Sequence, residues 1–354
     1  MDYNVIGEAV DRLVTVPMSN WTILKGLPLT DVYEYAREKA GLPLTMLAAQ
    51  KIKDAVQSGD TVLILTGFVI ANWDKPETDG PIGAAALARS LELGLGAVPV
   101  LLCEDLIVEN LQKTVCAAGL IACDTMEELR TGGRGRKALV QGFPVDHEAA
   151  KKEALHILDE YKPKVVISIE RPGWNEKGEH HSGMGYNISS ISAKLDYLFI
   201  EAQKRGIVTV GIGDLGNELG MGYVKDKVRE KIPGAERCLC GCGGGVACDV
   251  SCDVGIICNI SNWGAYGVCA CIAALVGEAE VLHDRQTELH MIDECVKAGA
   301  LDPVSGMYRP YVDGEPNYIN GHIIDMLHRI IRHITDGSIF TKSYRDTWLK
   351  EKMV

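Results

Sequence analysis

The sequence predicts an α/β domain built on a predominantly parallel sheet with helices on both faces, preceded by an N-terminal helical segment. Two observations predict this class. From Thr61 onward, short apolar runs typical of buried strands alternate with stretches of helical spacing. Unusual polar residues follow one strand-like run after another, at the edge where open α/β sheets bind ligands. The chain has 354 residues, 47% of them hydrophobic, which suffices for a substantial core.

The N-terminal segment is predicted to be helical and to pack on the main domain. Apolar residues from Leu44 to Val56 recur at helical spacing, with Pro43 suited to the first turn and Gly59 to the stop. We therefore divide the chain into a helical segment, residues 1–58, and an α/β domain, residues 59–354.

The remaining elements alternate in order. A helix rich in alanine is predicted over residues 83–93, behind Pro81, and an amphipathic helix over residues 321–334. Such alternation implies a parallel sheet that is covered on both faces. The predicted strands are residues 61–66, 97–102, 138–140, 165–169, 207–212 and 254–257.

The composition of the chain limits the kinds of partner that it can bind and the cellular compartment in which we expect it. The net charge of −12 argues against nucleic acid or an anionic membrane as the main partner. The longest apolar stretch, residues 263–276, is too short to span a bilayer. No basic region follows Met1, so no signal peptide is expected. Twelve cysteines then fit reduced thiols and a cytoplasmic location.

The most informative segment is the glycine-rich turn at residues 211–222, which follows a strand-like run. It places Asp214, Asn217 and Glu218 among five glycines. Carboxylate and amide oxygens are the ligands that hard divalent cations prefer. A dinucleotide fingerprint is the competing interpretation, but Asp214 would then place negative charge in a pyrophosphate cradle.

A second polar segment, residues 77–81, precedes the helix predicted at 83–93. Asp79 could cap that helix. Alternatively, the free amides of Gly80, Ile82 and Gly83 could face an anionic substrate group.

A third segment opens with Glu170 and Arg171 at the end of a predicted strand. A carboxylate there is costly unless it is paired or metal-bound, and Arg171 could neutralise it. The polar loop that follows, through residue 187, is typical of an active-site lid. His180 or His181 could shuttle protons there, or either could be an ordinary loop histidine.

Six cysteines gather between residues 238 and 258. A structural zinc or an iron–sulfur cluster is conceivable, yet the spacing matches neither zinc ribbons nor ferredoxins. Cys258, Cys269 and Cys271 are expected to be small core residues. The patch consists of Cys238, Cys240, Cys242, Cys248, Cys252 and Cys258.

With these residues located, the chain resembles the D-glutamate cyclase-like family. The similarity extends from about residue 60 to 275 in the family's order, and weakly to residues 301–306. Leu215 replaces a usual glycine, residues 181–187 match only loosely, and the cysteine patch is a departure. The matching runs are residues 66–68, 76–88, 168–173, 211–222 and 261–266.

The resemblance implies divalent-metal dependence and, as in characterised eukaryotic relatives, cyclisation of D-glutamate to 5-oxo-D-proline with loss of water. Mn²⁺ or Mg²⁺ would be held by Glu170, Asp214 and Glu218. Asp79 or His181 would act as the base, and Arg171 or the amides after Asp79 would hold the substrate carboxylate. The expected substrate-binding residues are Thr66, Gly67, Glu77, Thr78, Gly80, Asn217, Ser261 and Asn262.

Two other functions fit the same residues. A metal held by acidic side chains also serves phosphate-ester hydrolysis. A non-catalytic protein that binds an amino acid or a metal is the other alternative. In each case the partner is a small molecule, anionic for either enzyme, and the sequence leaves a homodimer open.

Overall fold

The computed structural model describes residues 3–17, 29–71, 73–131, 135–232 and 234–335, with side chains to residue 332. Its central feature is a seven-stranded sheet in the order β5-β6-β4-β1-β7-β8-β9, all of whose pairings are parallel. The strands are β1 (Thr61–Thr66), β4 (Val98–Cys103), β5 (Ile121–Cys123), β6 (Lys137–Gly142), β7 (Val165–Ile169), β8 (Val208–Gly213) and β9 (Val254–Ile257).

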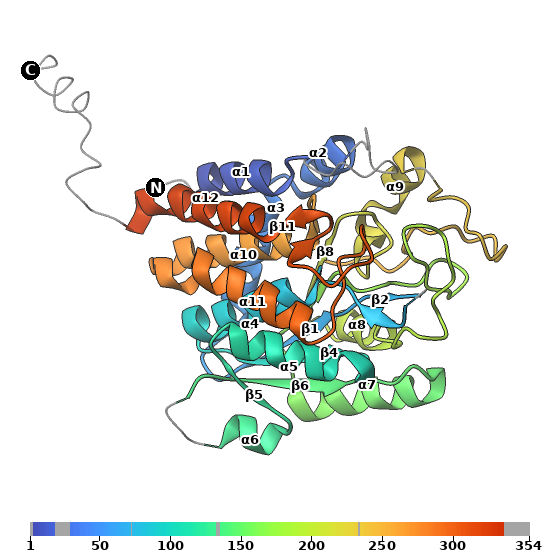
Figure 1. Ribbon diagram of the computed structural model, residues 1–354, viewed down its shortest axis with the longest axis horizontal. Helices are drawn as coiled ribbons and strands as arrows, with labels where there is room; N and C mark the ends of the chain where they lie inside the picture. The colour runs from blue at the N-terminus through green and yellow to red at the C-terminus, as the bar shows by residue number, and fades with distance from the viewer. Residues whose placement is uncertain (1–2, 18–28, 72, 132–134, 233, 336–354) are drawn as a thin grey trace, which may run out of the picture.

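Helices cover both faces of this sheet, which confirms the predicted α/β class (Figure 1). Three short 3-10 helices are η1 (Asp105–Ile107), η2 (Met221–Val224) and η3 (Ala279–Val281). The α-helices are α1 (Tyr3–Val14), α2 (Leu29–Ala40), α3 (Leu44–Ala55), α4 (Pro81–Leu95), α5 (Val108–Ala117), α6 (Met126–Arg130), α7 (His147–Tyr161), α8 (Asp196–Lys204), α9 (Lys225–Lys231), α10 (Ser261–Val276), α11 (Arg285–Lys297) and α12 (Asn317–Thr335).

The direction of the crossovers locates the site. The chain leaves β1 through α4 toward β4, and it leaves β7 through α8 toward β8, on the opposite side in the sheet order. Because such crossovers are right-handed, α4 and α8 lie on opposite faces. The adjacent β1 and β7 therefore form a switch point, and a crevice opens beyond their carboxyl ends.

The N-terminal helices pack onto the same core. Helices α1 and α3 contact α10, and α2 and α3 contact β9. A buried carboxylate joins the three helices: Asp11 on α1 accepts hydrogen bonds from the Tyr33 hydroxyl, the Leu44 amide and the Thr45 amide and hydroxyl. The division of the chain at residue 58 stays a prediction.

Several element boundaries differ from the sequence prediction. Helix α3 ends at Ala55, before Gly59, and Pro43 is its N-cap rather than a first-turn residue. Strand β5 was missed because it has only three residues, and Ile121 at its start is 51% exposed. Two short hairpins were also missed: β2 (Val69–Ile70) with β3 (Lys75–Pro76), and β10 (Tyr311–Val312) with β11 (Glu315–Pro316).

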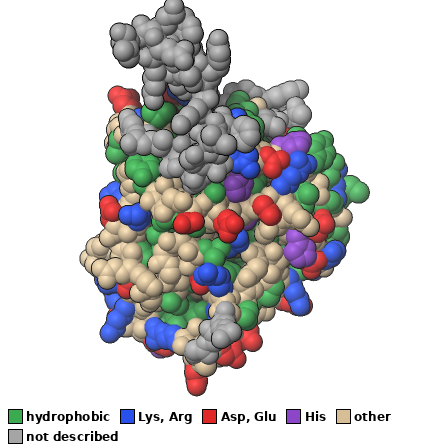
Figure 2. Space-filling model, turned by 90° about the vertical axis from the view of Figure 1, so that its left-hand side faces the viewer, with side chains coloured by type: hydrophobic (Ala, Val, Ile, Leu, Met, Phe, Trp, Pro, Cys, Tyr) green, Lys and Arg blue, Asp and Glu red, His purple; other side chains and the backbone are tan. Residues whose placement is uncertain are grey.

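The surface is mixed in character. On the face drawn in Figure 2, acidic and basic side chains are interspersed with hydrophobic ones. Among the described helices, none combines the length and the apolar character that a membrane crossing needs.

Candidate active site

Three acids meet beyond the carboxyl ends of β7 and β8. Glu170 follows β7 directly, and Asp214 and Glu218 lie in the glycine-rich turn after β8. One carboxylate oxygen of each lies within 4.8 Å of those of the other two. The structure thus brings together the three acids that the sequence analysis selected as metal ligands.

A second trio shares Asp214. Carboxylate oxygens of Asp79, Asp214 and Asp313 also lie within 4.8 Å of one another. Asp313, which the sequence analysis missed, occupies the turn of the β10–β11 hairpin at φ +49°. Buried Asp302 holds that turn by accepting a hydrogen bond from the Gly314 amide at 2.8 Å. The Asp313-Gly314 pair is a hairpin signal, but nothing local indicates that the turn reaches the sheet edge.

Glu170 is held in an unusual backbone conformation. Its φ of +39° lies in the left-handed region, which side-chain-bearing residues rarely adopt and which clusters at functional sites. The Ser261 hydroxyl donates a 2.5 Å hydrogen bond to Glu170 Oε2. Ser261, predicted to bind substrate, thus also positions Glu170.

Asp79 and Asn262 cap each other's helices. Asp79 accepts hydrogen bonds from the amides of Ser261 and Asn262 at the start of α10, both at 2.8 Å. Asn262 Oδ1 in turn accepts from the amides of Gly80 and Gly83 at the start of α4, at 2.9 and 2.7 Å. Two of the three amides that were predicted to face a substrate anion, those of Gly80 and Gly83, are therefore already bonded to Asn262. Asp79 caps α10 rather than α4.

Glu218 organises the glycine-rich turn from inside. Its carboxylate accepts hydrogen bonds from the amides of Leu215 and Gly216 at 2.9 and 2.7 Å. A side chain at Gly213 would collide with Glu218, since an added Cβ would lie 2.5 Å from Oε2. The turn therefore needs glycine at position 213, and it orients Glu218 toward Asp214.

Burial and mutual repulsion disfavour ionisation of this cluster. Burial raises the pKa values of Glu77, Glu170, Asp214 and Asp313 well above their ordinary range, and neighbouring carboxylates raise them further. Burial also raises the pKa of Asp79 to about 7, although three amides oppose this. Among the described side chains, no Lys or Arg forms an ion pair with these five acids.

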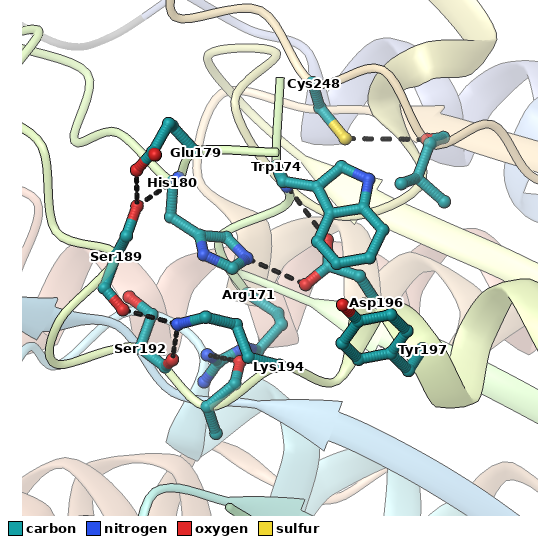
Figure 3. Close-up of polar contacts among 12 residues, drawn as sticks. Arg171, Trp174, Glu179, His180, Ser189, Ser192, Lys194, Asp196, Tyr197 and Cys248 are labelled. Atoms are coloured by element: carbon teal, nitrogen blue, oxygen red, sulfur yellow. Dashed lines mark hydrogen bonds and ion pairs between the residues drawn. The ribbon is translucent and has the colours of Figure 1, made fainter. Parts of the chain in front are cut away.

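Arg171 does not join the cluster, contrary to its predicted roles. Its guanidinium is fully buried and bonds Glu104 at 2.6 Å and the carbonyls of Gly67 and Ala193, both at 2.9 Å. Figure 3 shows Arg171 beside Lys194 and the loop that leads into α8. Gly67, predicted to bind substrate, is therefore a backbone partner of Arg171. Glu104 follows β4 and Gly67 follows β1, so Arg171 ties the loop after β7 to the loops after both of these strands.

The two loop histidines lie in separate environments, neither among the acids. His180 Nε2 is 2.7 Å from Asp196 Oδ2 in the buried network of Figure 3. His181 Nε2 lies 3.2 Å from Cys240 Sγ, so the imidazole does not reach the acid cluster as the predicted base would. Only its carbonyl approaches the site, by accepting a hydrogen bond from Asn217 Nδ2 at 3.0 Å.

A cavity of about 200 Å³ opens above the acids. Its lining combines apolar side chains with carboxylates, as ligand sites commonly do. Thr66 and Thr78, predicted to bind substrate, lie buried below the lining, and neither hydroxyl has a hydrogen-bond partner in the described chain. The lining includes Phe68, Ile70, Trp73, Met184, Leu215 and Val304, together with Glu77, Glu170, Asp214, Asp313 and Asn217.

The donor set fits a hard divalent cation. Asp214 Oδ1 and Asn217 Oδ1 are buried and lack a hydrogen-bond partner within the described residues. Buried oxygens in that state are costly, and a cation would satisfy them. Carboxylate and amide oxygens are also the ligands that Mg²⁺ and Mn²⁺ take in proteins.

Comparison with known proteins identifies the family of this chain. A human protein named "D-glutamate cyclase, mitochondrial" is 34% identical over 220 residues, which cover 61% of this chain and 33% of the human protein. The alignment thus spans about a third of that relative. The family model described as "D-glutamate cyclase-like, C-terminal" matches residues 30–328, a range that contains all six acids of the site: Glu77, Asp79, Glu170, Asp214, Glu218 and Asp313. The chain therefore belongs to the D-glutamate cyclase-like family.

Proposed function

We propose that this chain is a metal-dependent enzyme that dehydrates D-glutamate to 5-oxo-D-proline. The observation that carries the proposal is the charge of the cavity. Four carboxylates line it, and no Lys or Arg does so among the described residues. Without a cationic side chain beside them, these carboxylates either keep their protons or bind a cation, and a bound cation would attract an anionic substrate. Family membership and the name of the human relative supply the reaction.

Glu170, Asp214 and Glu218 would hold Mn²⁺ or Mg²⁺, with Asp313 close enough to Asp214 to contribute. A bound cation would act as a Lewis acid on a substrate carboxylate. Glu218 already accepts hydrogen bonds from turn amides at both oxygens, so Glu170 and Asp214 are the more available donors. The two trios meet at Asp214, which makes it the central ligand of the proposal.

Ring closure forms a bond between the substrate nitrogen and its γ-carboxyl carbon, and one carboxyl oxygen leaves as water. Two protons must pass from the ammonium group to that oxygen. Asp79 has a pKa of about 7, which matches a neutral working pH, but it does not line the cavity, and its carboxylate already accepts three amide hydrogen bonds. The apolar wall of the cavity would exclude bulk water and favour dehydration.

The structure gives less support to phosphate-ester hydrolysis. That alternative used the amides at the start of α4 as the phosphate site. Asn262 occupies two of them, those of Gly80 and Gly83.

An assay of the purified protein tests the proposed reaction. We expect D-glutamate to be consumed and 5-oxo-D-proline to appear with Mn²⁺ or Mg²⁺, and both to stop when a chelator is in excess. L-Glutamate and a generic phosphomonoester are the comparison substrates. Ligand-dependent thermal stabilisation without product would instead indicate a binding protein, and phosphate release without loss of D-glutamate would indicate a phosphatase.

Cation binding should also depend on pH with a defined sign. Because the folded state raises the pKa values of these acids, their contribution to the stability of the metal-free fold is fully present below about pH 4. This contribution is lost as the pH rises, and the part that belongs to Asp79 is lost through about pH 7, where Asp79 ionises. Because a cation must displace the bound protons, Mn²⁺ should raise the melting temperature more at pH 7.5 than at pH 5.5. At about a hundred times its Kd the ion would add about 2.7 kcal/mol. Equal shifts at the two pH values in differential scanning fluorimetry would contradict this.

A further inference from the structure

A second cluster of ligand-type side chains lies outside the acid cluster. It consists of His181 and of Cys238, Cys240 and Cys242, whose ligand atoms all lie within 4.8 Å of one another. Cys238 Sγ is 3.4 Å from Cys240 Sγ and 3.3 Å from Cys242 Sγ. His181 Nε2 is 3.2 Å from Cys240 Sγ and 3.9 Å from Cys242 Sγ.

The loop that carries the cysteines is built to bring them together. Gly241 and Gly243 flank Cys242 with φ values of +76° and +79°, a left-handed conformation that glycine adopts without strain. The Leu239 amide donates a hydrogen bond to the Gly185 carbonyl at 2.9 Å, which joins this loop to the one that carries His181. The cysteines occupy every second position of residues 238–242, and all three sulfurs lie close to the His181 imidazole.

Hydrogen bonds to one sulfur resemble those around metal-bound thiolates. The Gly244 amide and Asn175 Nδ2 each donate to Cys242 Sγ at 3.4 Å. Asn175 is buried, and it is held by a 2.7 Å hydrogen bond to the Gly245 carbonyl. Such partners orient metal ligands in known sites.

We propose that His181, Cys238, Cys240 and Cys242 bind one zinc ion in tetrahedral geometry. Bonds of about 2.3 Å to sulfur and about 2.0–2.1 Å to nitrogen place tetrahedral ligand atoms about 3.5–3.8 Å apart. Four separations between these atoms, 3.2–3.9 Å, lie within about 0.5 Å of that spacing, so small side-chain movements would complete the tetrahedron. Three thiolates with one imidazole select zinc over the hard cations that suit the acid cluster.

The other cysteines of the patch do not belong to this site. Cys248, Cys252 and Cys258 are buried, and each donates a hydrogen bond to a backbone carbonyl. The Cys248 thiol, drawn in Figure 3, donates its hydrogen bond to the Val250 carbonyl at 3.5 Å. Cys258, Cys269 and Cys271 are core residues, as the sequence predicts.

The zinc would clamp two loops at the mouth of the cavity. Ser182, Gly183 and Met184 line the cavity directly after His181. The His181 carbonyl also accepts a hydrogen bond from Asn217, which lines the cavity as well. The ion would thus hold the lid loop against the cysteine loop without touching the substrate.

Elemental analysis of protein purified without chelator is the primary test. We expect about one zinc per chain, and less than a tenth of that in the Cys238→Ser/Cys242→Ser variant. Cys116→Ser, which removes an exposed thiol on α5, and Asp214→Asn should keep the zinc. The zinc content is measured without any assay of turnover, so it tests the zinc site even if the protein does not convert D-glutamate.

Two measurements on the unmodified chain cover the case in which the double variant does not fold. Co²⁺ added to zinc-depleted protein should produce thiolate-to-cobalt absorption near one equivalent. Zinc should also slow tryptic cleavage after the exposed Lys177 and Arg237, which lie in the two clamped loops. Absence of zinc together with no cobalt absorption, or a disulfide among the three cysteines in freshly purified protein, would overturn the proposal.

Discussion

Replacing Asp214 with Asn should abolish turnover while leaving the fold intact. The two acid trios share Asp214, so its loss removes a donor from both. Even partners that only orient a metal ligand cost 10–100-fold when removed, so we expect a loss of more than about a hundredfold in kcat/KM. Steady-state assays with saturating Mn²⁺ and D-glutamate measure it.

The same variant should not be destabilised without a cation. Asp214 Oδ1 forms no hydrogen bond within the described chain, and asparagine has nearly the same shape. Removing one charge from a cluster of like charges relieves repulsion, so the melting temperature of metal-free protein should stay equal or rise. Asp54→Asn, an exposed change on α3, is the matched control and should retain activity. Undiminished turnover in Asp214→Asn would remove the metal-site model.

Replacing Arg171 with Leu should destabilise the protein by about 3–5 kcal/mol, the usual cost of breaking a buried ion pair. The change leaves Glu104 charged and buried, and it frees the carbonyls of Gly67 and Ala193. Urea unfolding monitored by circular dichroism gives the free energy of unfolding. Arg205→Leu removes exposed pairs with Asp159 and Glu201, and it should cost less than about 1 kcal/mol.

The double variant Arg171→Leu/Glu104→Gln separates structure from chemistry. Removing the unpaired charge should recover part of the lost stability. If Arg171 held the substrate carboxylate, Arg171→Leu would instead raise KM and leave the free energy of unfolding within about 1 kcal/mol of the unmodified protein. That outcome would contradict the structural role assigned to this pair.

The strands and the edge that carries the site were predictable because both depend on local pattern. The apolar runs at β1 and β7 are buried along their full length, and β8 is buried at every residue after Val208, which is typical of a parallel sheet covered on both faces. Glu170 and Asp214 follow such runs directly, so the parallel arrangement alone brings them to one edge.

The partners of the polar residues were not predictable, because they depend on contacts far apart in the chain. Asp79 meets Asn262 across 183 positions, and Arg171 meets Glu104 across 67. Two neighbours in the sequence also have different surroundings: Glu170 lies among the acids, whereas the Arg171 guanidinium bonds the Ala193 carbonyl in the loop before α8. Asp313 arrives from a hairpin whose placement no local pattern encodes.

The mutual capping of α4 and α10 determines where this protein tolerates change. Asp79 and Asn262 each complete the other's helix, so altering either one would loosen both helix starts and the acids beside them. Met184 and Val304, by contrast, line the cavity and are partly exposed, at 47% and 38%. Substitutions at Met184 and Val304, whether natural or designed, are therefore the changes by which the same acid cluster would come to accept a different ligand.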